Sequence, residues 1–236
     1  ISVDKTGKLK VHTTKTASAV ITASYGPVVQ NVTVTVADGR FWYSLGNGLG
    51  NGLDNNWYLD GNNASVVSSD GNKTTVQMGS GYRGDLWLAR SGKGKIVNVT
   101  PADYRYFAIK VGFKSQLVPG KNKPNGCIKL EIFDDGIKKI GPEYFGTGGD
   151  ANNRYEILGA SEISTTEPNV LYYDLQSKYK TVTPTDWNQV FDLVQCKFVI
   201  ADFPETAQTY DLYWIRSFKS IEELQAFVDS ENNTNE

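Results

Sequence analysis

The sequence predicts an all-β protein built around an antiparallel sandwich, with one short helix at its C-terminal end. Three observations lead to this prediction. The 236 residues are rich in types that favour strands and turns, with 13 Tyr, 10 Phe, 5 Trp and 23 Gly. Apolar residues recur with period two in about eight to ten short segments separated by turn signals. Helical periodicity is convincing only in the segment 220–228.

Residues 1–37 form the first predicted unit, a small β unit separate from the rest of the chain. Its alternating segments, SVDKTGKLKV, SAVITASYG and VVQNVTVTV, are divided by Gly and Pro. So few strands leave edges without partners. We therefore expect this unit either to dock on the main domain or to expose edges that associate. The main domain is predicted to span 38–236.

A Gly- and Asn-rich segment near the start of the main domain, GNGLGNGLDNNWYLDGNN, contains two aromatic residues, Trp57 and Tyr58. Gly and Asn tolerate tight turns and positive φ, so these rings have little regular structure to pack against. Either the rings close one end of the sandwich, or they are displayed to a ligand. In the second case Trp57 and Tyr58 form a loop-borne ligand-binding site.

Three strands of the main domain pair an apolar face with a face that is aromatic and charged. They lie in the segments YRGDLWLAR, YRYFAIKVGF and CIKLEIF. Leu, Ile, Val or Phe fills one alternating set in each, which predicts that this set points into the core. The opposite sets are Arg83, Asp85 and Trp87 in the first strand, Tyr104, Tyr106 and Lys110 in the second, and Lys129 and Glu131 in the third.

These polar–aromatic faces have the composition of a carbohydrate-binding surface. A pyranose stacks its C–H face on an aromatic ring, and charged side chains hydrogen-bond to its hydroxyl groups. The residues predicted to bind the sugar are Trp87, Tyr104 and Tyr106 as stacking platforms, with Arg83, Asp85 and Lys110 as hydroxyl partners. The alternative is that this face packs under a loop, with Arg83 and Asp85 as a satisfied ion pair.

The segment 209–228 predicts a strand followed directly by a helix. Its first part alternates with period two, and both sets are largely apolar, so we expect a strand covered on both faces and Trp214 in the core. Ser220 and Glu223 then form a capping box. One helical face would be formed by Ile221, Leu224, Phe227 and Val228. The polar tail 229–236 is expected to fray.

Several of these motifs resemble an uncharacterised family of modules in secreted and surface proteins of gut Bacteroidetes. The resemblance runs from about residue 82 to 224 and rests on YRGDLWL, RYFAIKV, LYYDL, VQCKFVIAD and YWIRSF in that order. Those modules resemble jelly-roll carbohydrate-binding modules, also called galactose-binding-like domains, which implies a jelly-roll sandwich here. The family pattern has Asp where this chain has Tyr213. That departure removes a carboxylate that often helps to hold a structural calcium in such modules.

The first 37 residues resemble a different family. The order SVDKTGKLKV, SAVITASYG, VTVTV is similar to the second half of a bacterial Ig-like domain of the invasin/intimin type. The resemblance implies a partial Ig-like β unit, and such units mostly serve as spacers that hold a functional module away from a surface.

Composition and motifs argue against several classes of function. With 24 Lys and Arg against 26 Asp and Glu, the chain lacks the basic field that nucleic-acid binding needs. The sequence contains no run of about 18 apolar residues, the length that a membrane-spanning helix requires. The only histidine, His12, lies outside the main domain and leaves it without a histidine base. LEIFDDG fails the alternating-carboxylate pattern of laminarinase-like jelly-roll glycosidases, because Ile137 stands where a further Glu is required.

No cofactor is predicted, and a structural calcium is the one metal left as an alternative. Oxygen ligands without the spacing of a calcium loop are offered by Asp134, Asp135, Asp202 and Asp211. Cys127 and Cys196, even with His12, are too few for a four-ligand zinc site. The two cysteines are either buried thiols or partners in one disulfide.

Together, the faces and the resemblance predict non-catalytic binding of a polysaccharide or oligosaccharide, at a cell surface or in a secreted glycan-degrading system. The alternatives are a jelly-roll glycoside hydrolase and a structural spacer or adhesin without a sugar site. The chain starts at Ile1 without a visible signal peptide, so we interpret it as a trimmed or mature fragment. The expected location is extracellular or on the outer cell surface, with lipid anchoring through a removed N-terminal segment as one form of it.

Overall fold

The computed structural model describes most of the chain, with gaps at several loops. The described residues are 2–10, 17–36, 40–50, 57–59, 64–78, 84–90, 93–94, 97–99, 102–116, 128–134, 156–159, 163–176, 191–200 and 208–233. All strand pairs among them are antiparallel, and the single helix, α1 (Ile221–Asn233), lies at the C-terminal end. The predicted all-β sandwich with a short C-terminal helix is therefore confirmed.

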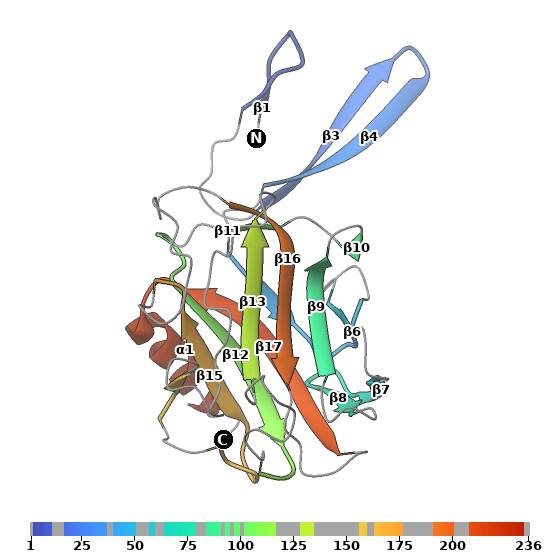
Figure 1. Cartoon of the computed structure of the whole chain (residues 1–236). Coiled ribbons are helices and arrows are strands. Elements are labelled where there is room, and N and C mark those ends of the chain that lie inside the picture. The colour runs from blue at the N-terminus through green and yellow to red at the C-terminus, as the bar shows by residue number, and fades with distance from the viewer. Residues whose placement is uncertain are drawn as a thin grey trace.

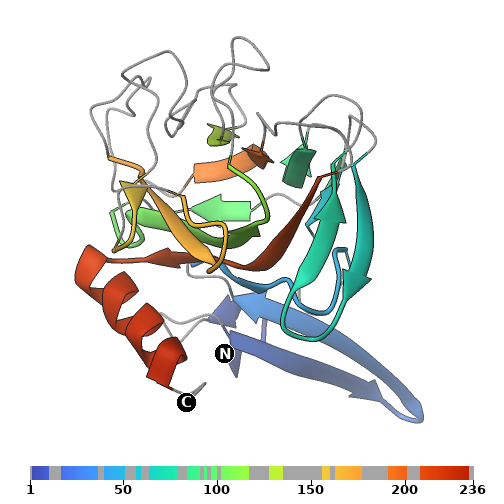
Figure 2. The ribbon, with the colours of Figure 1, turned by 90° about the horizontal axis from the view of Figure 1, so that it is seen from below.

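Two sheets face each other across the core (Figures 1 and 2). The seven-stranded sheet has the order β14 (Glu156–Ile157), β15 (Asn169–Asp174), β12 (Tyr106–Phe113), β17 (Thr209–Phe218), β8 (Thr74–Gln77) and β7 (Ser65–Ser69), with β5 (Trp42–Ser44) also paired to β17. The six-stranded sheet has the order β10 (Lys93–Gly94), β9 (Gly84–Arg90), β16 (Phe191–Ile200) and β11 (Val97–Val99), with β13 (Ile128–Asp134) on β16 and β6 (Tyr58–Leu59) on β9.

The main core fills the space between the sheets with the apolar sets that the alternation predicts. The seven-stranded sheet contributes Phe107, Ile109 and Val111, all fully buried. Leu86 and Leu88 meet them from the six-stranded sheet. Burying one such side chain contributes about 1.5–3 kcal/mol relative to leaving it exposed. Cys196 is a free thiol in the same core, as one of the two cysteine alternatives predicts, whereas Cys127 lies outside the described residues.

A β-bulge interrupts the alternation of β17. Lys110 pairs with Trp214 but the next residue, Val111, pairs with Leu212, so Tyr213 is the extra residue. As a result Leu212 and Ile215 belong to the core between the sheets, whereas Trp214 lies in the second apolar cluster beneath the helix. The strict alternation predicted for this strand is therefore wrong at Tyr213 and Trp214. The predicted burial of Trp214 is confirmed, at 4% exposure.

Helix α1 covers part of the outer face of the seven-stranded sheet (Figure 2). Its N-terminus is capped as predicted, because the Glu223 N–H donates to Ser220 Oγ at 3.2 Å. The Glu223 carboxylate in turn accepts from the Lys219 N–H at 2.7 Å. The buried residues of the second cluster are Ala108, Val170, Trp214, Phe218 and Leu224. The prediction that the chain frays from residue 229 is wrong, because the helix continues to Asn233.

The N-terminal residues form two separate hairpins. β1 (Ser2–Val3) pairs with β2 (Leu9–Lys10), and β3 (Ala17–Tyr25) pairs with β4 (Val28–Val36). Both hairpins project from one end of the sandwich (Figure 1), and within the described chain neither adds a strand to the main sheets. Val20, Val28 and Val32 are 57–62% exposed, so the second hairpin does not dock on the main domain through these side chains. The predicted boundary at 37–38 lies outside the described residues.

Candidate functional site

Trp87 does not lie on an open surface, contrary to the role predicted for it. It points away from the main core, next to Tyr58 on β6 and Lys197 on β16 in the strand register. Lys197 Nζ lies 4.5 Å from the centre of the Trp87 ring, and both residues are only 7% exposed. A ring so deeply buried offers no face on which a sugar could stack. Arg83 and the side chain of Asp85 lie outside what the structure describes.

The other predicted platforms belong to the opposite sheet, so the predicted shelf is not a single surface. Tyr104 precedes β12 and is 7% exposed. Tyr106 packs beside the helix-covered cluster, with its ring 6.2 Å from that of Tyr172. Lys110, predicted as a hydroxyl partner, donates to Glu231 of the helix at 3.1 Å. Strand alternation shows which face of its own strand a residue occupies, but not which sheet the strand joins.

Trp57 decides between the two alternatives left open for the Gly- and Asn-rich segment. Its exposure is 0%, and its ring packs 5.9 Å from Tyr43 and 5.8 Å from Phe198. This ring closes the sandwich and is not displayed. Tyr58 is half-buried beside Trp87. The predicted loop-borne display of Trp57 is therefore wrong, because its ring is buried in the core, and the next residue, Tyr58, lies on the short strand β6 that pairs with β9.

A different group of aromatic and cationic side chains surrounds an exposed tryptophan. We call it the Trp42 cluster; it consists of Arg40, Trp42, Tyr104, Arg216 and Lys219. Trp42 is 43% exposed, whereas the other tryptophans that the structure describes are at most 7% exposed. The guanidinium carbon of Arg40 lies 4.0 Å from the centre of a Trp42 ring, and that of Arg216 lies 4.4 Å away.

Local strand geometry builds this cluster. Trp42 on β5 lies opposite Arg216 on β17 in the strand register. Phe41, between Arg40 and Trp42 in sequence, is 1% exposed and packs in the main core. Its N–H donates to Ser217 Oγ at 2.8 Å, and the Ser217 N–H donates to the Phe41 carbonyl at 2.9 Å. Because residues i and i+2 of a strand share a face, this anchor places Arg40 and Trp42 together on the outside.

The helix supplies a second wall of the Trp42 cluster. Phe227 of α1 packs edge-to-face on Trp42 with 5.3 Å between ring centres. Glu223 in the first turn forms an ion pair with Arg40 at 3.3 Å. Tyr104 completes the group, since the Arg40 guanidinium and the Lys219 ammonium lie 5.8 Å and 5.6 Å from the centre of its ring.

Positive charge is concentrated at Trp42. Burial lowers the pKa of Arg216, Glu231 raises it, and the neighbouring Arg40 lowers it further. The Glu231 carboxylate, 3.4 Å from Arg216, also accepts hydrogen bonds from Lys110 and from Trp214 Nε1. One carboxylate thus serves two cations and an indole.

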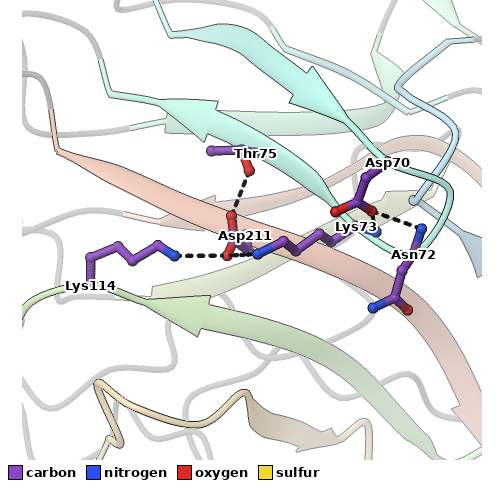
Figure 3. Close-up of polar contacts among 6 residues, drawn as sticks. All are labelled: Asp70, Asn72, Lys73, Thr75, Lys114 and Asp211. Atoms are coloured by element: carbon purple, nitrogen blue, oxygen red, sulfur yellow. Dashed lines mark hydrogen bonds and ion pairs between the residues drawn. The ribbon is translucent and has the colours of Figure 1, made fainter.

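The uncovered part of the same sheet carries a second charged group, the Asp211 cluster of Asp211, Lys73, Lys114 and Thr75 (Figure 3). Asp211 is 3% exposed and contacts Lys73 at 2.8 Å, Lys114 at 3.1 Å and Thr75 Oγ1 at 2.6 Å. Burial raises the pKa of Asp211, but the hydrogen bonds from Lys73, Thr75 and Lys114 outweigh it and hold the pKa below its usual value. Its oxygens are therefore occupied by these donors.

Metal binding finds no support among the described side chains. They contain no group of three His, Cys, Asp or Glu residues suited to hold a metal ion. Asp211, one of the oxygen ligands considered for calcium, is instead neutralised by two lysines. Asp135 and Asp202 lie outside the described residues, as does the side chain of Asp134.

The described part of the chain also holds no helix long and apolar enough to cross a membrane.

The fold and the two clusters define a class: an antiparallel β-sandwich module with an aromatic–cationic patch beside its C-terminal helix. Residues 48–224, more than half of the chain, match the family described as "Domain of unknown function (DUF4979)". The chain belongs to this family. Searches of curated proteins and of solved structures each found no significant match.

Proposed function

We propose that the protein binds carbohydrate without catalysis and that Trp42 is the platform on which a pyranose ring stacks. The observation that carries this proposal is the exposure of Trp42, at 43%, beside the cationic side chains of Arg40 and Lys219. Arg40 and Arg216 cover part of the indole, and its remaining exposed surface meets the C–H side of the sugar.

The neighbouring side chains supply the polar half of such a site. Arg40 and Lys219 donate hydrogen bonds, and Glu223, 37% exposed at its side chain, accepts them. Charged partners form hydrogen bonds roughly twice as strong as neutral ones, so they discriminate between hydroxyl arrangements. Glu223 forms an ion pair with Arg40 and accepts the Lys219 N–H, contacts that suit positioning better than proton transfer to a glycosidic bond.

A purely structural module is the rival proposal, and it rests on the same contacts. Trp42 packs on Phe218 and Phe227, so the ring also fastens the helix to the sheet. The two proposals differ in whether the exposed part of Trp42 binds a sugar.

We place the carbohydrate-binding function outside the cell or on its outer surface, where a protein meets polysaccharides.

The test is binding of soluble neutral and acidic polysaccharides by calorimetry and affinity electrophoresis. Trp42→Leu keeps an apolar side chain against Phe218 and Phe227 but removes the flat π face. We expect it to weaken binding at least about tenfold, which corresponds to about 1.4 kcal/mol. Tyr25→Ala, a 90% exposed ring at the tip of the N-terminal hairpin, is the matched control and should leave affinity unchanged.

Thermal unfolding of each variant separates binding from folding. Because Trp42 is nearly half exposed, Trp42→Leu should remain folded at the temperature of the binding assay. No binding to any polymer, or binding equal in wild type and folded Trp42→Leu, would leave the structural module as the better account.

A further inference from the structure

The two guanidinium groups beside Trp42 form an arrangement that a neutral sugar does not require. Arg40 and Arg216 lie 4.0 Å and 4.4 Å from the centre of the same indole. Like charges brought together repel, and the cost is greatest where water is excluded. The Arg216 side chain is 12% exposed, and its buried Nε has no hydrogen-bond partner among the described residues. The arrangement therefore suits an incoming negative charge.

The described carboxylates beside this cationic pair, Glu231 and Glu223, each accept from more than one donor. Glu231 is shared between Arg216, Lys110 and the Trp214 indole. Glu223 is shared between Arg40 and the backbone N–H of Lys219, and both side chains of its ion pair are about a third exposed. A partly exposed ion pair of this kind is weak, so a ligand anion can compete for Arg40. Lys219, exposed and close to Tyr104, adds a third positive charge.

We propose that the ligand of the Trp42 cluster is an acidic glycan, a polymer whose pyranose rings carry carboxylate or sulfate groups. This inference rests on the proposed carbohydrate-binding function. The sugar ring stacks on the exposed part of Trp42, and its anionic group binds the partly exposed guanidinium of Arg40, whose planar fork matches a carboxylate or a sulfate. Arg216, mostly buried, attracts the anion through its charge.

Matched polymers test the charge directly. Polygalacturonate and its fully methyl-esterified form share one backbone and differ in carboxylate charge. Dextran sulfate and dextran also share one backbone, and they differ in sulfate charge. We expect the wild type to bind the charged member of at least one pair about tenfold more tightly, at about 0.15 M salt. The pair that shows the preference identifies the anion.

Two substitutions link that preference to the Trp42 cluster. Arg40→Gln should remove most of the preference for the charged polymer, because it weakens binding of the charged member of a pair more than binding of the neutral member. Glu223→Gln should increase the preference about two- to threefold, because it removes the competing carboxylate while Gln still completes a capping box. Lys8→Gln, the same change of charge on the exposed N-terminal hairpin, is the control and should have no effect.

The outcomes separate this inference from the function on which it rests. Equal binding of charged and neutral polymers, abolished by Trp42→Leu, would overturn the acidic-glycan inference and keep carbohydrate binding. A preference that Arg40→Gln leaves intact, or that Lys8→Gln reduces equally, would mean diffuse electrostatic attraction and would also overturn it. Failure to bind any of the four polymers would overturn the inference, and the wider polysaccharide panel would then decide the proposed function separately.

Discussion

The outer face of the seven-stranded sheet carries two charged clusters, and only one of them has the character of a binding site. In the Asp211 cluster a buried carboxylate meets two lysines and a threonine, so its charge is matched within the protein. In the Trp42 cluster two guanidiniums flank an exposed indole and share their carboxylates with other donors. The two clusters differ in charge balance and in the exposure of an aromatic ring, and our binding proposal depends on this difference and not on the presence of charged residues alone.

The largest effect expected from this comparison is on stability, at Asp211. Asp211→Ala would leave Lys73, Lys114 and Thr75 facing the sheet without their acceptor. We expect the free energy of unfolding to fall by about 2–3 kcal/mol, less than for a fully buried pair because both lysines are partly exposed. Urea denaturation measures this change.

Lys114→Met is the control for that substitution. Its side chain is 52% exposed, so its removal should cost less than about 1 kcal/mol. If Asp211→Ala is equally mild, Asp211 is not the structural centre of its cluster, and the contrast between the two clusters fails.

Residue patterns were sufficient to predict local structure in this protein. The apolar sets of β9 and β12 point into the core as their period-two alternation predicts. Ser220 and Glu223 start the helix as the capping box predicts. These features depend on neighbours within a few residues, and the sequence displays such neighbours directly.

The candidate site could not be predicted in the same way, because non-local pairing creates it. Trp42 meets Arg216 only because β5 pairs with β17, and these two strands are far apart in the sequence. The bulge at Tyr213 depends on the register between β12 and β17, which no local pattern specifies. The one local signal is that Arg40 and Trp42 alternate with Phe41, and this pattern does not show which strand lies beside them.

A second, smaller effect on stability is expected at Glu231, the carboxylate that anchors the C-terminal end of the helix. It accepts hydrogen bonds from Lys110, Trp214 Nε1 and Arg216. Glu231→Ala should lower the free energy of unfolding by about 1–2 kcal/mol and increase amide exchange in residues 229–233. Asp229→Ala, an exposed carboxylate in the same helix, should change stability by less than about 0.5 kcal/mol.

Glu231→Ala also sharpens the comparison between the clusters. It removes the carboxylate nearest Arg216, so the Trp42 cluster becomes more cationic. If the cluster binds anionic sugars, the variant should lose stability while keeping or increasing its affinity for the charged polymer. A parallel loss of stability and affinity would indicate that the helix anchor, and not the charge, controls the site.

The smallest expected effect is the pH dependence that Asp211 gives to stability. Its pKa in the folded protein lies below the ordinary value of 3.8. A group with a lowered folded pKa stabilises the protein above its unfolded pKa, and this contribution disappears as the pH falls through the folded pKa.

Unfolding of wild type and Asp211→Asn at a series of pH values measures this contribution. The comparison between the two proteins cancels the titration of the other carboxyl groups that they share. Wild type should be the more stable protein at pH 7, with a constant difference down to about pH 4, and the difference should shrink below that value. A difference that grows in acid would mean that the folded state raises the pKa of Asp211, because burial would then outweigh the hydrogen bonds from Lys73, Thr75 and Lys114.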